Sequence, residues 1–215
     1  MSEQYFTADP AAPHREGSVH VLLPDVHLEL VTDAGVFSPK RLDLGTRVLL
    51  DVAPPPPATG NLLDLGSGYG PLALVLAARS PGATIWAVDV NQRALALTQA
   101  NANQAGLGNV RCALPDDPEL PARFDLIWSN PPIRIGKQAL HQLLDGWLER
   151  LAPGAAAYLV VQRNLGSDSL QQWLIQSGRA AERAAAKTGY RVLKVTSAGG
   201  SGGSPPRGST TRATA

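Results

Sequence analysis

The sequence predicts an α/β fold with a doubly wound, mostly parallel sheet, and two observations lead to this prediction. Short apolar runs alternate along the chain with longer stretches of helical spacing, an order that gives right-handed crossovers. One of these runs, Asn61 to Gly70 (NLLDLGSGYG), reads as a strand, a glycine-rich turn and the start of a helix. The chain has 215 residues with 44% hydrophobic content, enough to bury one core of this kind.

Three parts are expected along the chain. Residues 1–17 are polar and contain two prolines, Pro10 and Pro13, which predicts a flexible leader. Residues 18–196 are expected to form the folded domain, whose first segment, 18–57, is a β cap over the site. Residues 197–215 are nearly free of apolar side chains and predict a disordered tail.

The cap segment begins with an alternating pattern. Val19 to Val31 alternates around a Pro24-Asp25 turn, which predicts a short antiparallel pair of strands. Apolar residues at helical spacing then predict a helix over 42–52, and a run of prolines over 54–57 ends it.

The remaining strands and helices follow in order. Pro71 suits the first position of a helix over 71–79, where its missing N–H is harmless. A second helix over 91–106 is capped by Asn91 and closed by Gly106. Further helices are expected over 137–151 and 169–178, strands over 83–88, 109–113, 124–129 and 155–161, a polar loop over 114–123, and a hairpin of 180–186 with 190–195 around Thr188-Gly189.

The net charge of the chain and the distribution of that charge lead to different expectations about nucleic-acid binding. The net charge is only +1, which argues against strong nonspecific binding of nucleic acid. No acid follows Glu182, however, and the basic residues beyond it are Arg183, Lys187, Arg191, Lys194, Arg207 and Arg212. A basic end that meets phosphates and an ordinary solvated surface both remain open.

Cysteine and histidine usage gives no sign of a metal site. Cys112 is the single cysteine, so no disulfide forms within the chain, and it reads as a small buried residue. The four histidines lack metal-ligand spacing. No apolar run is long enough to cross a membrane, and the first residues lack a signal-peptide pattern. We therefore expect a soluble, cytoplasmic, monomeric protein without metal.

The glycine-rich turn predicts a cofactor site. Gly66, Gly68 and Gly70 have no side chains, so main-chain N–H groups can approach a ligand closely. A dinucleotide site would place its third glycine one residue later, and Asp64 would repel a pyrophosphate. A ligand with a cationic end and a ribose fits better, and S-adenosylmethionine has both. A tight turn that binds nothing is the alternative.

An acid also ends the next predicted strand. Asp89 follows the strand over 83–88, near the spacing of about 20 residues at which such an acid meets ribose hydroxyls in doubly wound folds. Hydrogen bonds from two hydroxyls to one carboxylate are charge-assisted and strong. A capping acid before Asn91 is the alternative. Ser67 and Val90, adjacent to these motifs, complete the predicted cofactor site.

The predicted reacting group is Asn130, in the sequence Asn130-Pro131-Pro132 after the strand over 124–129. Open α/β sheets place their chemistry at the carboxyl ends of strands. Two prolines fix φ and donate no hydrogen bonds, so we expect a rigid turn with bare carbonyls. The Asn130 amide and the Pro131 carbonyl would accept both hydrogens of an exocyclic amine and aim its lone pair at a methyl sulfonium. A purely structural turn is the alternative.

With these motifs the chain resembles class I S-adenosylmethionine-dependent methyltransferases, whose first motif is an acidic strand end followed by G-x-G-x-G. The stretches SNPPIRIGK and GVFSPKRLDLGT resemble more narrowly the small methyltransferase domain family that methylates guanine N2 in small-subunit (16S) rRNA. The resemblance spans residues 19–196 and implies a Rossmann-like sheet of seven strands with one antiparallel strand. Two-domain members carry a second, degenerate half, so this chain resembles the single-domain members.

The resemblance implies roles for further residues. Its catalytic motif covers Asn130, Pro131 and Pro132. Its third motif, which contacts adenine, falls at Asp116 and Asp117, of which Asp116 is the candidate and a surface turn is the alternative. Because Ile133 cannot stack on a base, Phe37 becomes the candidate clamp for a flipped base, and an ordinary core position is the alternative. Four flanking cations, Lys40, Arg41, Arg134 and Lys137, would bind phosphates of ribosomal RNA or of the small ribosomal subunit if the motifs converge, and ordinary exposed surface charges are the alternative.

Three other functions remain open from the sequence. A protein glutamine-N5 methyltransferase shares N-P-P but usually follows it with tyrosine, so Ile133 counts against it. A small-molecule methyltransferase is compatible with the low net charge. A noncatalytic RNA-binding or assembly module would have lost Asn130 or a loop glycine, and neither is lost.

Overall fold

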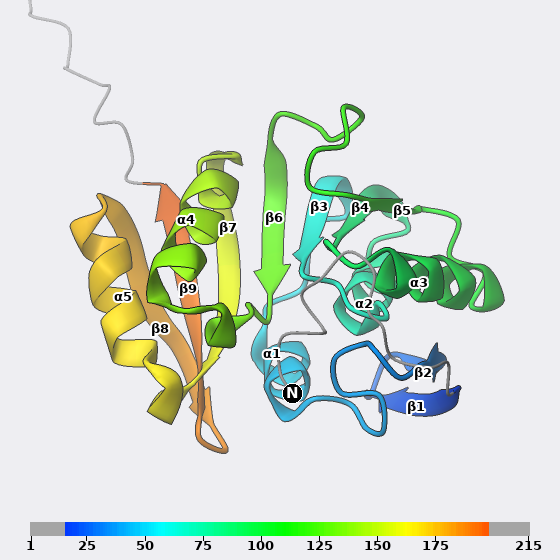
Figure 1. Ribbon diagram of the computed structural model, residues 1–215. Helices are drawn as coiled ribbons and strands as arrows, with labels where there is room; N and C mark the ends of the chain where they lie inside the picture. The colour runs from blue at the N-terminus through cyan, green and yellow to red at the C-terminus, as the bar shows by residue number, and fades with distance from the viewer. Residues whose placement is uncertain (1–15, 198–215) are drawn as a thin grey trace, which may run out of the picture.

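A seven-stranded sheet runs through the molecule in the order β5-β4-β3-β6-β7-β9-β8 (Figure 1). The computed structural model describes residues 16–197, so most of the predicted leader and nearly all of the predicted tail lie outside the described residues. Five neighbouring strands are parallel, and β9 runs antiparallel to both of its neighbours, which confirms the predicted sheet. The strands are β3 (Thr59–Leu65), β4 (Gly82–Val88), β5 (Val110–Ala113), β6 (Phe124–Ser129), β7 (Leu151–Gln162), β8 (Arg179–Lys187) and β9 (Tyr190–Ser197).

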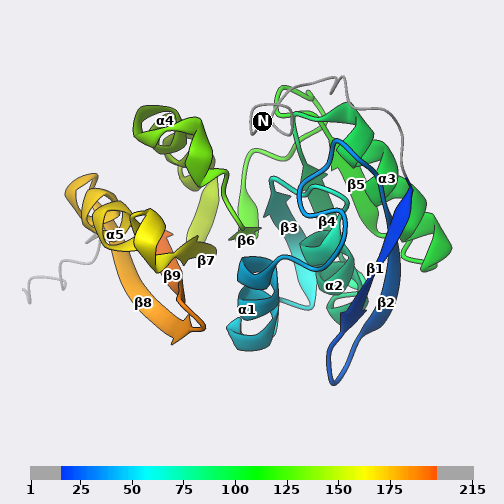
Figure 2. The same cartoon turned by 60° about the horizontal axis from the view of Figure 1, so that its bottom comes forward.

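Helices cover the sheet on two faces, and successive residues of each strand point to opposite faces. Leu62 packs into the core beneath α1, α2 and α3, whereas Leu63 packs into the core beneath α4 and α5. Figure 2 shows α4 and α5 on one side of the sheet and α1 and α2 on the other. The helices are α1 (Leu44–Val52), α2 (Pro71–Arg79), α3 (Gln92–Gln104), α4 (Lys137–Leu148) and α5 (Ser167–Gln176), with short 3₁₀ turns η2 (Ile133–Ile135) and η3 (Arg163–Leu165).

The N-terminal cap is present as predicted. Strands β1 (Gly17–Leu22) and β2 (His27–Thr32) pair antiparallel around the predicted Pro24-Asp25 turn. The Asn101 side chain of α3 holds β2 by accepting from the Val31 N–H at 2.7 Å and donating to the Val31 carbonyl at 3.0 Å. The hairpin is thereby fixed beside α3, and the loop that follows it leads to α1.

Several element boundaries differ from those predicted, among them the start of α1, the end of α4 and the start of β7. Helix α1 begins at Leu44 because Asp43 is its N-cap, whose side chain accepts from the Thr46 N–H. Helix α4 ends at Leu148, and β7 begins at Leu151, ahead of the Pro153-Gly154 pair that was expected to precede the strand. Leu151 pairs with Phe124 there, at an irregularity in the register of β6 and β7.

Candidate active site

A cavity of about 540 Å³ opens at the carboxyl ends of the central strands, and residues of α1, α2, α3 and α4 contribute to its lining. Its volume lies in the range of small-molecule sites. The loop before α1 contributes to its lining, so the cap segment reaches the site through this loop and through α1. Of the predicted site residues, those that line the cavity are Phe37, Asp64, Gly66, Ser67, Gly68, Asp89, Val90, Asn130, Pro131, Pro132, Ile133 and Arg134.

The glycine turn adopts backbone conformations that favour glycine at each of its three positions. Gly66, Gly68 and Gly70 have φ of 77°, 57° and 94°. Gly70 does not line the cavity, because a Cβ there would lie 2.6 Å from Leu74 Cδ1 and 2.8 Å from Thr98 Cγ2. Gly66 and Gly68 therefore face the cavity, and Gly70 packs the turn against α2 and α3.

Asp64 is fully buried at the end of β3 and has one oxygen without a partner. Its Oδ2 accepts from the Ala73 N–H in the first turn of α2 at 2.9 Å. Neither its Oδ1 nor the buried Ser67 Oγ has a hydrogen-bond partner among residues 16–197. Burial raises the pKa of Asp64 to about 8. A ligand that carries both a donor and an acceptor would satisfy these two polar groups beside the cavity.

Asp89 links the glycine turn to α3. Its Oδ2 accepts from the Gly68 N–H at 2.8 Å, and its Oδ1 accepts from the Asn91 N–H at 2.9 Å. The capping of α3 itself is performed by Asn91, whose side chain accepts from the N–H groups of Arg93 and Ala94. Burial raises the pKa of Asp89. Each carboxylate oxygen retains capacity to accept from a ribose hydroxyl, so the predicted ribose contact stays a prediction.

The Asn130 amide is held in one orientation by two residues of α1 and its cap. Its Nδ2 donates to Asp43 Oδ1 at 2.7 Å and to Thr46 Oγ1 at 3.1 Å. A carboxylate can only accept, so this contact determines which end of the amide is nitrogen. Asn130 Oδ1 has no hydrogen bond within the described part of the chain. The amide therefore presents an acceptor that no residue from 16 to 197 uses.

The carbonyls of the proline turn are not bare, and that prediction was wrong. The Pro131 carbonyl accepts from the Ile133 N–H at 2.8 Å, and the Pro132 carbonyl accepts from the Ile135 N–H at 3.1 Å. Pro132, with φ −74° and ψ 74°, forms an inverse γ-turn that brings the Ile133 N–H back onto the chain. A carbonyl oxygen has two lone pairs, so Pro131 retains one for a substrate.

Asp43 holds the Asn130 amide through a contact that was not predicted from the sequence, and its removal tests whether the amide orientation matters. We expect Asp43→Ala to lower kcat by roughly tenfold to a hundredfold, since Asn130 loses a charge-assisted hydrogen bond of about 1.5–3 kcal/mol. Asp43→Asn, which keeps an acceptor, is expected to restore most of the activity. Kinetics with varied substrate should place the loss in kcat rather than in KM for the cofactor.

The helix cap provides the control for this test. Asp43→Ala also removes the N-cap of α1, at a cost of about 1 kcal/mol in stability. Asp43→Ser restores a cap while its side chain is one bond too short to hold Asn130 in the same way. Full activity in the serine variant would assign Asp43 to helix capping alone.

The adenine contact predicted for Asp116 is not supported. Asp116 is exposed and does not line the cavity, although its neighbour Pro115 does. Asp117 accepts from the Glu119 N–H at 2.8 Å, within the same turn. These contacts describe a surface turn, which was the alternative interpretation. Phe37, by contrast, lines the cavity with 47% of its surface exposed, and its role as a base clamp stays a prediction.

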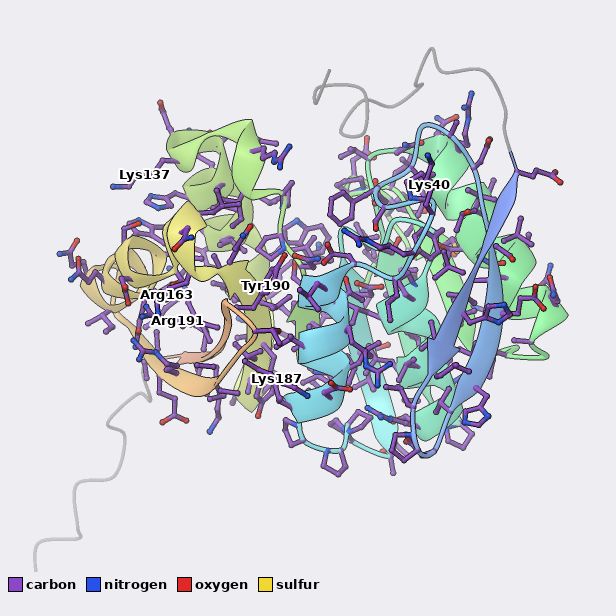
Figure 3. The ribbon with its side chains drawn as sticks, turned by 90° about the horizontal axis from the view of Figure 1, so that it is seen from below. Lys40, Lys137, Arg163, Lys187, Tyr190 and Arg191 are labelled. Atoms are coloured by element: carbon purple, nitrogen blue, oxygen red, sulfur yellow. The ribbon has the colours of Figure 1, made fainter. Side chains whose placement is uncertain are left out.

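Cations without an acidic partner gather around the cavity. Figure 3 views this face of the molecule and shows Lys40 on one side, and Lys137 and Arg163 on the other. Within residues 16–197, the site cations that form no ion pair are Lys40, Arg41, Arg134, Lys137 and Arg163. Of these, only Arg134 lines the cavity. Arg163 was not predicted from the sequence.

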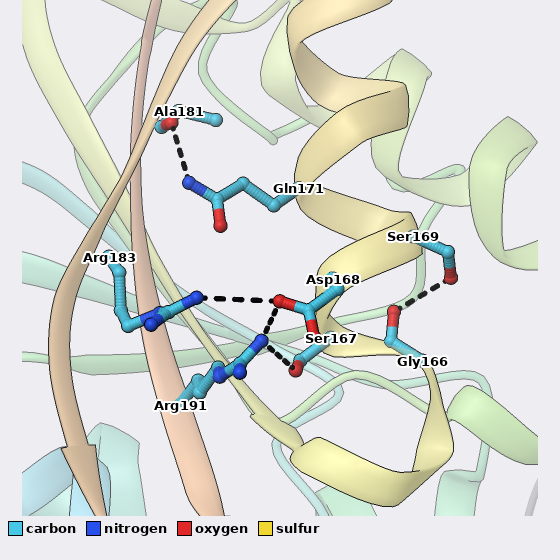
Figure 4. A network of polar contacts seen from close by, with 8 residues as sticks. All are labelled: Gly166, Ser167, Asp168, Ser169, Gln171, Ala181, Arg183 and Arg191. Carbon is cyan, nitrogen blue, oxygen red and sulfur yellow. Dashed lines mark hydrogen bonds and ion pairs between the residues drawn. The ribbon is translucent and has the colours of Figure 1, made fainter.

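The cations of the C-terminal hairpin are arranged differently, because each one in the described residues has an acidic partner. Arg183 and Arg191 both contact Asp168 at the start of α5 (Figure 4). Lys187 pairs with Asp51 of α1, and Lys194 pairs with Glu182. These four charges favour the ordinary surface over a phosphate-binding end, while Arg207 and Arg212 lie outside the described residues.

The doubly wound sheet, the acidic glycine turn and the amide-proline turn define an S-adenosylmethionine-dependent methyltransferase of class I. The chain belongs to the methyltransferase small domain family, which it matches over residues 27–194. Asp64 and Ser67 fit the cofactor, since the unpartnered carboxyl oxygen suits its ammonium and the unpartnered hydroxyl suits its carboxylate. The donor set of the cavity thus agrees with the family.

Several curated relatives match this chain. The uncharacterized protein YbxB of Bacillus subtilis (strain 168) is 33% identical over 198 residues, covering 91% of this chain and 98% of YbxB. Ribosomal RNA small subunit methyltransferase C of Pseudomonas entomophila (strain L48) is 33% identical, covering 81% of this chain and 52% of that protein. The chain spans about half or less of the length of the methyltransferase C relatives.

Solved structures share the fold. The T. thermophilus 16S rRNA N2 G1207 methyltransferase, in complex with AdoMet and guanosine, superposes with a TM-score of 0.67 at 22% identity. The match covers 87% of this chain and 52% of that chain. No helix in residues 16–197 is long and apolar enough to cross a membrane, and that part contains no cluster of three metal-ligating side chains.

Proposed function

We propose that this protein transfers a methyl group from S-adenosylmethionine to the exocyclic N2 amine of a guanine in small-subunit rRNA. The observation that carries the proposal is the fixed Asn130 amide, whose nitrogen is bound to Asp43 and whose oxygen is left for a substrate. An oxygen acceptor in this place suits an N–H donor such as an amine. It would not suit a substrate that reacts as an alkoxide or a thiolate, because these anions have no hydrogen to donate.

In the proposed mechanism, Asn130 Oδ1 and the remaining lone pair of the Pro131 carbonyl accept the two hydrogens of the amine. A guanine amine is flattened by conjugation with its ring, and these two hydrogen bonds favour a tetrahedral nitrogen with an available lone pair. The cofactor supplies a methyl group activated by its sulfonium. An N–C bond forms as the C–S bond breaks, and the nitrogen afterwards releases a proton to water. Positioning supplies most of the acceleration.

The unpaired cations support a nucleic-acid substrate. Arg134 lines the cavity, and Lys40 and Arg163 lie on either side of this face of the molecule (Figure 3). None of the three has an acidic partner among residues 16–197, and such cations bind phosphates with strong salt dependence. A glutamine side chain or a small apolar substrate carries no phosphate that these cations could bind. The names of the methyltransferase C relatives and of the guanosine complex agree with RNA as the substrate. A cytoplasmic location and a monomeric state are expected for such an enzyme.

Methyl transfer from tritiated S-adenosylmethionine tests this function. Small ribosomal subunits, naked small-subunit rRNA and bulk protein are each incubated with the enzyme, and label is expected in RNA. Digestion of that RNA and mass spectrometry should then give N2-methylguanosine. Label in protein with none in RNA would contradict the proposed substrate, and methylation at another atom would contradict the proposed amine.

A further inference from the structure

Two polar side chains at the ends of β7 and β9 line the cavity and belong to no part of the mechanism above. Gln162 ends β7, Tyr190 begins β9, and the two are partners in the antiparallel register. Resting on the proposed function, we propose that these two residues select the target base. Gln162 would read the O6 and N1–H edge of guanine, and the Tyr190 ring would form a wall against the base.

The strand pattern directs both side chains to the same side of the sheet as Asn130. Trp128, Val160 and Val192 all belong to the core beneath α1, α2 and α3. Asn130, Gln162 and Tyr190 each lie two residues from one of these, and alternate residues of a strand share a face. The ends of β6, β7 and β9 therefore present an amide, a second amide and a phenol to one cavity.

Both side chains are available to a ligand. Gln162 and Tyr190 are half-buried, and in the part of the chain that is described neither side chain forms a hydrogen bond. Burial and the nearby charge of Asp43 raise the pKa of Tyr190, so the ring beside the cavity stays uncharged. Figure 3 shows Tyr190 at the centre of this face, between Lys40 and Arg191.

Gly45 allows Tyr190 to lie close to the start of α1. A Cβ at position 45 would lie 2.8 Å from Tyr190 Cε1 and 3.0 Å from Asp43 Oδ1. A side chain there would displace both the ring and the carboxylate that holds Asn130. The absence of a side chain at Gly45 thus brings the proposed base wall and the amide-orienting acid together.

The hairpin that carries Tyr190 is fixed at several points, so the ring does not depend on a mobile loop. Lys187 pairs with Asp51 of α1 at 2.8 Å, and the Gly189 carbonyl accepts from the Arg163 N–H at 2.8 Å. Arg191 contacts Ser167 and Asp168 at the start of α5 (Figure 4). Side chains held in place in this way need little reordering when a substrate binds.

The chemistry of guanine matches this set of groups. Its Watson–Crick edge presents an O6 acceptor, an N1–H donor and the N2 amine in a row. The Gln162 amide offers one donor and one acceptor side by side, which suits O6 and N1–H together. Asn130 Oδ1 then accepts from the N2 amine at the end of the row. A base extruded for chemistry is commonly read through this edge and held by aromatic side chains.

Binding of two nucleosides tests the proposal without requiring methyl transfer. Guanosine and 2-aminopurine riboside are titrated into the protein saturated with S-adenosylhomocysteine; the second nucleoside keeps the N2 amine but lacks O6 and N1–H. The wild type is expected to prefer guanosine by roughly tenfold or more, because the analogue leaves the Gln162 amide unpaired. Gln162→Leu is expected to lose this preference.

Further variants separate the two residues and control for folding. Tyr190→Ala should weaken both nucleosides to the same degree, and Tyr190→Phe should bind both as the wild type does. Gln176→Leu, the same substitution at an exposed position of α5, should change neither affinity. Retained binding of S-adenosylhomocysteine shows that each variant is folded.

The outcomes distinguish this proposal from the function on which it rests. A Gln162→Leu variant that keeps the preference for guanosine overturns the proposed reading of the base. A wild type that methylates rRNA but shows no preference between the nucleosides overturns it as well. If the wild type places no label in RNA, the proposed function fails first, and the selection of guanine fails with it.

Discussion

Asn130→Ala is expected to lower kcat for RNA methylation by about a thousandfold, with the affinity for S-adenosylmethionine nearly unchanged. The substitution removes the acceptor that the structure leaves open beside the proline turn. Without it, the amine of the base stays conjugated with its ring, and its lone pair is not directed at the methyl group of the cofactor. Single-turnover kinetics gives the chemical step, and calorimetric titration of the cofactor gives its affinity.

The stability of this variant should change little. Asp43 Oδ1 loses Asn130 but still accepts from the Thr46 N–H at 3.0 Å, so the carboxylate keeps a partner. Thermal unfolding of the cofactor-bound protein should therefore resemble that of the wild type. A variant that loses cofactor binding as well would assign Asn130 to the architecture of the pocket. A variant that retains activity would leave the proposed mechanism without its acceptor.

The convergence of the glycine turn and the proline turn was predictable because it follows from strand direction. Asp64 and Asn130 end neighbouring parallel strands, and the carboxyl ends of such strands meet at one edge of the sheet. The local sequence of each motif also restricts its backbone conformation, since glycines permit positive φ and prolines fix φ at about −65°. The fold class and the position of the cavity needed nothing more.

The orientation of the Asn130 amide was not predictable, because it depends on a contact between residues far apart in the chain. Asp43 and Asn130 are separated by 87 positions, and only the packing of α1 against the sheet brings them to 2.7 Å. Asp43 did have a local signal as a possible N-cap before an apolar helix. That signal indicates where α1 begins. It gives no information about which distant side chain donates to the Asp43 carboxylate.

Backbone torsions explain another difference between prediction and structure. Proline fixes φ and leaves ψ free, and the ψ of 74° at Pro132 allows the Ile133 N–H to reach the Pro131 carbonyl. The pairing of Gln162 with Tyr190 was also not predictable from the sequence. It follows from the register of β9 on β7, which depends on where the Thr188-Gly189 turn lies in the fold. Sequence spacing alone leaves both undetermined.

Asp64→Asn is expected to weaken the binding of S-adenosylmethionine by roughly a hundredfold, and to remove most of its pH dependence. Asp64 has a pKa of about 8 because it is fully buried, so below that pH it is mostly protonated in the free protein. Pairing with the ammonium of the cofactor requires the ionised form. In the wild type, affinity should therefore rise from pH 6 to pH 8, and binding near pH 6.5 should release about one proton.

The same shift affects stability in the opposite direction. The unfolded chain ionises Asp64 near pH 3.8, whereas the folded chain holds its proton until about pH 8. The favourable contribution is complete below pH 3.8 and is lost as the pH rises toward 8, by about 1.4 kcal/mol per pH unit. Without cofactor, Asp64→Asn should consequently be more stable than the wild type at pH 8 and similar to it at pH 4, as denaturant unfolding at the two pH values would measure.

A ligand control separates the ammonium contact from a general role of Asp64 in the pocket. 5′-Methylthioadenosine keeps the adenosine part of the cofactor and lacks its amino-acid end. Its affinity should be independent of pH between 6 and 8 and equal in the wild type and Asp64→Asn. S-adenosylhomocysteine, which has the ammonium, should behave like the cofactor. If Asp64→Asn weakened 5′-methylthioadenosine to the same degree, the buried carboxyl would serve to shape the glycine turn, and its raised pKa would be a consequence of burial without a part in binding.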